Sequence, residues 1–396
     1  MLRIAVRMLL GDPTKWMGVV FGVLVCTFLI THMLSMFHGM MERSYALVTD
    51  IPQADVWVMD AAVQYADEPI AMPETALDRV RGIEGVAWAV PLHTATLRAR
   101  LSSGAFQPVL LIGVDDATLL GAPEHIIDNS AWVLRRHEMA IVDHTSAGTL
   151  LRMPIAPREE RPGFQELDLS GPTRPLRVGD ELQINDHRVV VGAFADLGTR
   201  FLSKPIVYTT YSRAVAIHPK ERNLLSFVLV KAAAGGDAAG LARRITRLTG
   251  LRARTAGEFC DDTYWYYVET TGVVKRIAMI VGIGVVTGVA VSALLLYLFT
   301  NENLRYYAVL KALGASNWLV LLMVTTQAAL AGSTGYGLGI GLSSAIGTIA
   351  KSDAMPYRLM ASTMVFAACA VLLVGVVSAT LSARKVVKLE PAMVFK

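Results

Sequence analysis

Four long stretches without a charged side chain constrain the fold of this chain more than any other feature. They are residues 16–41, 277–301, 312–350 and 359–383. A helix needs about 20 mostly apolar residues to cross the hydrocarbon core of a bilayer, and each stretch is long enough. Only 18% of all residues are charged, which agrees with a chain that lies partly in a membrane. We therefore predict four membrane-spanning helices, at residues 16–41, 277–301, 317–350 and 359–383.

Arg3 and Arg7 precede the first stretch, as they would in a signal peptide. Its apolar run is longer than the about 7–15 residues of a signal peptide, so we interpret it as a retained span. Basic residues near the ends of spans mark the cytoplasmic side. They gather before span one, between spans two and three, and after span four: Arg3, Arg7, Lys15, Arg305, Lys311, Arg384, Lys385 and Lys388.

This charge pattern predicts a multi-pass protein of the bacterial inner membrane with both termini in the cytoplasm. Residues 1–15 form the cytoplasmic N-terminal segment, and residues 384–396 form the tail. Residues 302–316 connect spans two and three inside the cell. The short loop 351–358 and the large insertion 42–276 lie outside.

The insertion is expected to fold as a water-soluble domain. Of the 33 acidic residues in the chain, all but Asp12, Glu302, Asp353 and Glu390 lie within it. Near each end, segments with strand and helix periodicity alternate and predict two βαβ-like halves. Residues 115–195 between them are rich in Pro, Gly and charge, and they read as an inserted β-rich section with one hairpin at 178–194. The predicted fold class is thus membrane α plus an extracytoplasmic α+β domain.

Motifs for chemistry are largely missing from the sequence. The segment 11–16, GDPTKW, lacks the second Gly and the Ser or Thr of a phosphate-binding loop, so the chain is not expected to hydrolyse ATP. His137 and His144 stand beside Glu138 and Asp143, but their spacing fits no helix-borne metal site. No elbow motif supports a hydrolase, and no basic stretch with interleaved aromatics supports nucleic-acid binding. We therefore expect no catalytic residue, cofactor, metal or nucleic-acid partner.

Glycines recur inside the spans, and we interpret them as packing positions where helices approach closely. The segment 332–341, GSTGYGLGIG, resembles the filter loop of potassium channels, yet it lies in the middle of a continuous apolar run. Packing is therefore favoured over a filter. The candidate packing residues are Gly18, Gly22, Gly284, Gly288, Gly335 and Gly339.

A helix-sized segment, residues 307–316 with the sequence YAVLKALGAS, stands where a flexible turn would suffice to join spans two and three. Its apolar residues fit a short rigid helix that Gly314 terminates. Such a helix can bind in a groove of a cytoplasmic partner. It can equally rest on the membrane lipid. The residues alone leave both interpretations open.

The same segment resembles the coupling segment of FtsX/MacB-type ABC permeases, whose pattern is approximately R-E-[IFY]-A-[VT]-L-[KR]-A-[IL]-G-A. The acidic position of that pattern is occupied by Tyr306. The order of one span, a large external domain, three spans and a basic tail also resembles these permeases. Among their subfamilies the chain most resembles DevC, through residues 51–60 (IPQADVWVMD) and 307–312 (YAVLKA). The matching residues are Arg305, Tyr307, Ala308, Val309, Leu310, Lys311, Ala312, Leu313, Gly314 and Ala315.

This resemblance implies a type VII ABC exporter in which the chain pairs with a separate ATPase subunit. It also implies a homodimer or a dimer with a related second permease, a periplasmic adaptor and an outer-membrane channel. Two further functions share the architecture: an FtsX-like regulator of a cell-wall enzyme, and a lipoprotein-release permease. In the coupling segment we expect Leu310 and Leu313 to be the apolar anchors on the ATPase, while Ala308 and Ala312 keep the helix slim.

Overall fold

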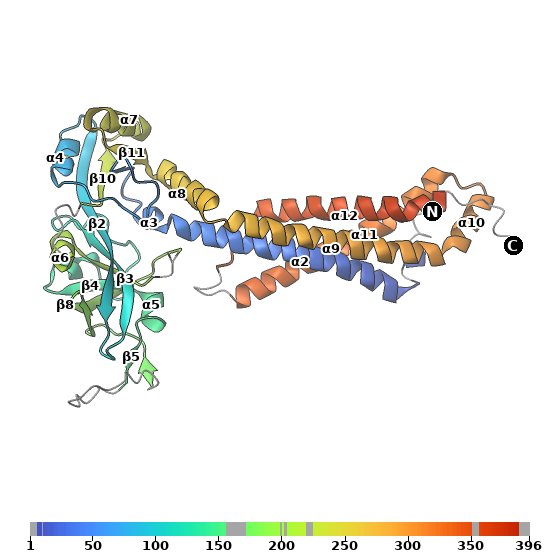
Figure 1. Cartoon of the computed structure of the whole chain (residues 1–396), viewed down its shortest axis with the longest axis horizontal. Coiled ribbons are helices and arrows are strands. Elements are labelled where there is room, and N and C mark those ends of the chain that lie inside the picture. The colour runs from blue at the N-terminus through green and yellow to red at the C-terminus, as the bar shows by residue number, and fades with distance from the viewer. Residues whose placement is uncertain are drawn as a thin grey trace. The chain divides into compact units, whose positions relative to one another are not determined.

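The computed structural model describes residues 6–9, 11–155, 172–198, 200–201, 204–218, 225–350 and 356–387, with side chains as far as residue 384. The chain divides into two compact units, one made of Met1–Met40 with Thr271–Lys396 and one of Met41–Thr270. Figure 1 labels their helices and strands. The predicted basic residues Arg3, Lys385 and Lys388 lie outside the described side chains.

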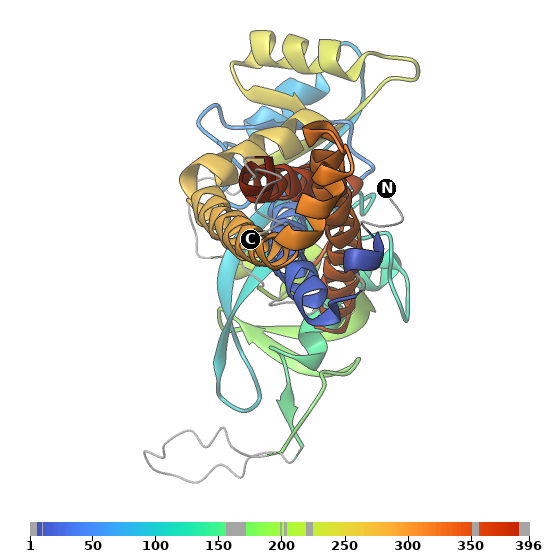
Figure 2. The same ribbon diagram turned by 90° about the vertical axis from the view of Figure 1, so that its right-hand side faces the viewer.

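The first unit contains four long helices: α2 (Pro13–Ser44), α9 (Val273–Glu302), α11 (Asn317–Ile349) and α12 (Ala361–Val387). Within the described residues, these four are long and apolar enough to cross a membrane. Figures 1 and 2 show them side by side. Each differs from the corresponding predicted span by at most four residues at either end.

The second unit is built on a mixed sheet in the order β11-β1-β10-β2-β3-β9-β4-β8-β7. At one end of the sheet lie β1 (Val56–Met59), β2 (Val86–Arg100), β10 (Phe227–Ala232) and β11 (Arg252–Thr255). Strand β10 is antiparallel to both β1 and β2, so β1 and β2 run parallel, with α4 (Thr75–Arg81) as their crossover. Strand β1 is likewise antiparallel to both β10 and β11, so β10 and β11 run parallel, with α7 (Ala238–Thr249) as their crossover. The two predicted βαβ-like halves therefore exist, and each places a strand inside the other.

The inserted section continues the same sheet with β3 (Phe106–Val114), β9 (Ile206–Thr210), β4 (Met139–Asp143), β8 (His187–Ala195) and β7 (Glu181–Ile184). Strand β3 pairs with β9 in parallel, and β4 pairs with β8 in parallel. The section is thus wider than the predicted 115–195, because β3 and β9 flank that range and belong to the same part of the sheet. Its smaller elements are η1 (Ala131–Arg135), α5 (His144–Gly148), β5 (Met153–Pro154), β6 (Thr173–Arg174) and α6 (Tyr211–Ile217).

The predicted hairpin is formed by β7 and β8, which pair antiparallel from Glu181 to Ile184. Its two-residue loop, Asn185 and Asp186, has φ values of 49° and 66°. Positive φ at both positions is the requirement of a type I′ turn, and Asn and Asp tolerate it better than most residues.

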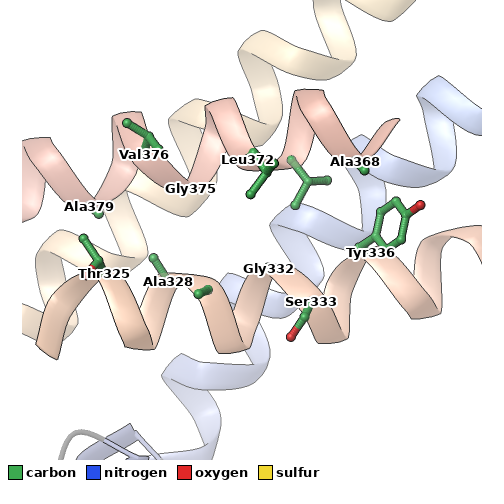
Figure 3. Close-up of a pocket in the computed structure, with 12 residues that line it drawn as sticks. Thr325, Ala328, Gly332, Ser333, Tyr336, Ala368, Leu372, Gly375, Val376 and Ala379 are labelled. Carbon is green, nitrogen blue, oxygen red and sulfur yellow. The ribbon is translucent and has the colours of Figure 1, made fainter. Parts of the chain in front are cut away.

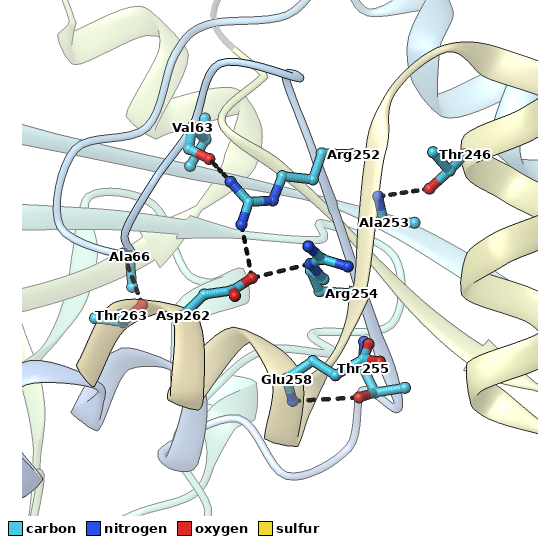
Figure 4. Close-up of polar contacts among 10 residues, drawn as sticks. All are labelled: Val63, Ala66, Thr246, Arg252, Ala253, Arg254, Thr255, Glu258, Asp262 and Thr263. Carbon is cyan, nitrogen blue, oxygen red and sulfur yellow. Dashed lines mark hydrogen bonds and ion pairs between the residues drawn. The ribbon is translucent and has the colours of Figure 1, made fainter. Parts of the chain in front are cut away.

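The closing strand of the second βαβ-like half is short. Strand β11 ends at Thr255, and α8 (Ala256–Thr270) begins there. The Glu258 carboxylate accepts a hydrogen bond from Thr255 N at 2.9 Å, and Glu258 N donates to Thr255 Oγ1 at 3.3 Å. This reciprocal pair is a capping box, which starts a helix. Figure 4 shows it beside Asp262, which holds Arg252 and Arg254 at 2.7 and 2.9 Å.

The core of the second unit centres on large side chains from both ends of its sequence. Trp57 packs edge-on against Phe227 with ring centroids 5.4 Å apart, and Phe259 of α8 lies 5.8 Å from both rings. The short helix α3 (Ala46–Thr49) adds Leu47 and Val48 to the same cluster. The segment that follows α2 and the helix that precedes α9 are therefore both built into this core.

Candidate functional site

The candidate site is α10 (Leu304–Ala312), the short helix between α9 and α11. It ends in a Schellman motif: Ala315 N donates to Leu310 O and Gly314 N donates to Lys311 O, both at 3.0 Å. Gly314 has φ +91°, a conformation that side chains oppose. Ser316 then caps α11, since its Oγ accepts a hydrogen bond from Leu319 N at 3.3 Å. The connection is therefore a defined helix with fixed ends.

One side of α10 exposes large apolar side chains. Tyr306 is 63% exposed, Val309 41% and Leu313 80%. Their spacing of three and four residues places them on one face, which we call the α10 outer face. Trp318, at the start of α11, is 73% exposed. Arg305, Ala312 and Gly314 are exposed as well.

The opposite side of α10 is buried. Tyr307 is fully buried and Ala308 is 3% exposed. Tyr307 belongs to a buried cluster that includes side chains from all four long helices, and Leu310 packs against that cluster. Lys311 is half-buried. Of the two leucines expected as apolar anchors, Leu313 is exposed and Leu310 is half-buried, while Ala308 is buried; the anchor role of both leucines stays a prediction.

The neighbouring ends of α2 and α9 are joined by ion pairs on the side of the bundle where α10 lies. Lys15 Nζ is 2.7 Å from Asp12 Oδ2 and also contacts the Glu302 carboxylate. Asp12 stands just before α2 and accepts a hydrogen bond from Lys15 N at 3.4 Å, while Pro13 occupies the first helical position. These contacts fix the start of α2 against the last turn of α9, from which α10 departs.

The six candidate packing glycines all face another helix of the same chain. An ideal Cβ at Gly18, Gly22, Gly284 or Gly288 would lie 2.6–3.3 Å from a side chain across the α2–α9 interface. At Gly335 and Gly339 it would meet α2 at 2.7 and 2.6 Å. At five of the six glycines the distance is below 3.0 Å, so a neighbouring atom would have to shift, and α2 packs closely against both α9 and α11.

The sequence analysis missed a second close contact, at the other end of the bundle. An ideal Cβ at Gly347 would lie 2.4 Å from the ring of Tyr357, and one at Gly39 would lie 2.8 Å from the Pro356 carbonyl carbon. The Tyr357 hydroxyl is 3.1 Å from Ser343 Oγ, and its ring lies 5.6 Å from that of His32. The polar residues His32 and Ser343 inside apolar spans were the available signal.

An apolar groove of 430 Å³ lies between α11 and α12. Figure 3 shows small residues along it, including Ala328, Gly332 and Gly375, with Tyr336 toward one end. The Tyr336 hydroxyl donates to Met364 O at 3.0 Å. None of the described residues that line the groove is charged. Its surface suits hydrocarbon rather than an ion or a polar substrate.

The second unit contains a buried charged pair. Arg200 is 3% exposed, and its Nη1 lies 2.8 Å from Asp50 Oδ2. Burial raises the pKa of Asp50, and the nearby Arg200 guanidinium opposes this rise. Burial also raises the pKa of Asp67, whose carboxylate accepts a hydrogen bond from the Tyr267 hydroxyl at 2.6 Å. Arg200 is thus paired with Asp50 after α2, and Asp67 is hydrogen-bonded to Tyr267 of α8.

Three of the four polar residues considered for a metal, Asp143, His144 and Glu138, have contacts outside that group. Asp143 caps α5 by accepting from Thr145 N at 3.3 Å and Ser146 N at 3.0 Å. The ring of His144 packs edge-on against Phe194, and Glu138 holds Arg188 at 2.9 Å. Within the described residues, no group of three His, Cys, Asp or Glu side chains could hold a metal ion.

Comparisons with known proteins bear on both units. A search of the curated proteins found no match. The extracellular domain of the ABC-type transporter YknZ from Gram-positive bacteria is 15% identical and has a TM-score of 0.33, covering 51% of this chain and 98% of its own. The periplasmic region of MacB from Actinobacillus actinomycetemcomitans is 12% identical with a TM-score of 0.37, covering 54% and 94%. A domain of a putative permease from Porphyromonas gingivalis is 12% identical with a TM-score of 0.30, covering 51% and 88%.

Residues 278–391 match the family model of the C-terminal domain of FtsX-like permeases. This range contains most of α9 and all of α10, α11 and α12. The match does not distinguish the DevC subfamily from its relatives. Residues 278–391 are thus similar to the C-terminal domain of the FtsX-like permeases.

Proposed function

We propose that the chain is the membrane subunit of an ABC exporter and transmits the ATP-driven movement of a separate ATPase to the unit Met41–Thr270. The observation that carries this proposal is the two-sided character of α10. Its outer face exposes Tyr306, Val309 and Leu313, while Tyr307 is fully buried. An apolar helix face of this kind fits a groove on a partner protein, and a buried opposite face lets the helix move the bundle.

The partners follow from how ABC ATPases work. Two ATPase protomers must close together to enclose ATP between them, and one set of four spans can engage only one ATPase protomer. The exporter therefore contains two copies of this chain, or one copy with a related second permease. In a DevC-like system, a periplasmic adaptor and an outer-membrane channel complete the path for a substrate taken from the periplasm or the outer leaflet.

Membrane lipid is the remaining partner. Large apolar side chains on the long helices are exposed, for example Val286 of α9 (69%) and Leu372 of α12 (67%). Leu372 also lines the groove between α11 and α12. In a bilayer these apolar surfaces contact lipid tails.

The topology of the chain provides a direct test. The basic residues Arg7, Arg305, Lys311 and Arg384 predict that both termini and α10 lie in the cytoplasm. A fluorescent reporter fused after residue 396 should fluoresce, and a phosphatase inserted within residues 156–161 should be active. A phosphatase that is active only when fused after residue 396 would place α10 outside the cell, where no ATPase can bind it.

A further inference from the structure

Tyr307 makes a polar contact in the middle of an otherwise apolar cluster. Its hydroxyl donates to Gln327 Oε1 of α11 at 3.1 Å, and neither side chain is more than 1% exposed. Removing the partner of a buried polar group destabilises the folded protein, and the cost is larger where water cannot replace that partner. The bond therefore favours one position of the Tyr307 ring.

The cluster around Tyr307 collects residues from every long helix. It contains Val19 of α2, Leu296 of α9, Val324 of α11 and Ala379 of α12. Helix α10 contributes Tyr307 to the buried part of the cluster, and its partly buried Leu310 packs against the cluster. A displacement of α10 that moves the Tyr307 ring must therefore act on all four long helices, because packed interiors deform little.

Breaks in the helical backbone separate α10 from α9 and from α11. Asn303 separates it from α9 with a non-helical φ of −90° and ψ of 8°, and Gly314 separates it from α11 in the left-handed conformation. The first junction is the single residue Asn303, and the second consists of the four residues from Leu313 to Ser316. The rotation of α10 about its own axis is then determined by the side chains on its inner face.

We propose that Tyr307 is a positioning residue: through its hydrogen bond to Gln327 and its fully buried ring, it fixes the orientation in which the α10 outer face meets the ATPase. The inference rests on the proposed function, and it assigns Tyr307 to the bundle rather than to the ATPase contact. The neighbouring Tyr306 has the opposite role, because it is 63% exposed on the outer face.

Two single-oxygen deletions within the same unit test this assignment. Tyr307→Phe keeps the ring and removes the hydrogen bond, and we expect it to weaken ATPase binding about threefold, which corresponds to about 0.6 kcal/mol. Tyr336→Phe removes a hydroxyl that bonds Met364 O at 3.0 Å, away from α10, and should leave binding unchanged. Binding is measured with the full chain in detergent at matched protein levels. Equal effects of the two variants, or no effect of Tyr307→Phe, would overturn the proposal.

Double variants separate positioning from a general loss of stability. Tyr307→Phe combined with Gln327→Leu should weaken binding no more than the more severe single variant, since both remove one bond. In a Leu313→Asp background, Tyr307→Phe should have no further effect, because the face that it orients no longer binds. Additive effects in both combinations would contradict the inference. If Leu313→Asp itself leaves ATPase binding intact, the proposed function fails; if only Tyr307→Phe is silent, the positioning role alone fails.

Discussion

Replacement of Leu313 by aspartate is expected to weaken binding of the ATPase at least tenfold. Leu313 is 80% exposed at the end of the α10 outer face, so it contributes little to the fold of the bundle. Burying a leucine side chain in a partner stabilises a complex by about 1.5–3 kcal/mol, and about 1.4 kcal/mol is a factor of ten. The aspartate loses this gain and adds the cost of removing a charge from water. Pull-down of the ATPase by the variant measures the effect.

Leu310 provides the matched comparison, because it is the same residue type three positions earlier. It packs against the buried cluster around Tyr307, so Leu310→Asp should reduce the amount of folded chain in the membrane. Leu313→Met should bind almost normally. Undiminished ATPase binding by Leu313→Asp, at normal membrane levels, would instead favour a helix that only rests on lipid.

The substitution Gly339→Ala is expected to destabilise the chain, whereas Gly341→Ala on the same helix is not. An ideal Cβ at Gly339 would lie 2.6 Å from Thr27 Cβ and 2.9 Å from the backbone oxygen of Leu24. A backbone atom of α2 cannot rotate away, so the helices must separate. Overpacking of this kind costs about 1–3 kcal/mol.

At Gly341 an added Cβ meets no described atom within 4 Å. Alanine is also the better helix former by about 0.8–1.0 kcal/mol, so Gly341→Ala should raise stability slightly. Thermal unfolding of the two purified variants in the same detergent compares them. Equal shifts of the melting temperature in the same direction would show that α2 and α11 do not pack as described.

The features of the fold that depend on residues close together in the sequence could be predicted from that sequence. The four spans follow from uninterrupted apolar length, and the β7–β8 hairpin follows from alternation around Asn185 and Asp186. The start of α8 was also encoded locally, by Thr255 and Glu258, but the apolar pattern there was too weak to exclude a strand. The width of the inserted section was not predictable, because β3 and β9 pair across almost a hundred residues of chain.

The orientation of α10 illustrates why the site was only partly predicted. Apolar residues occur all round this helix: Tyr306, Val309 and Leu313 are exposed, Tyr307 and Ala308 are buried, and Leu310 is half-buried. A pattern of this kind identifies a helix but does not distinguish its inner from its outer face. The distinction depends on the long-range contact between Tyr307 and Gln327, which no local pattern contains.

The central claim is that this chain couples to an ATPase that it does not itself contain. The most direct measurement is ATP hydrolysis by the purified chain alone, by the separate ATP-binding subunit with the chain, and by that subunit with the Leu313→Asp variant. The account predicts no turnover by the chain alone, turnover with the wild-type complex, and a large loss of complex-dependent turnover with Leu313→Asp. Hydrolysis by the chain alone, after contaminating ATPases are excluded, would contradict it.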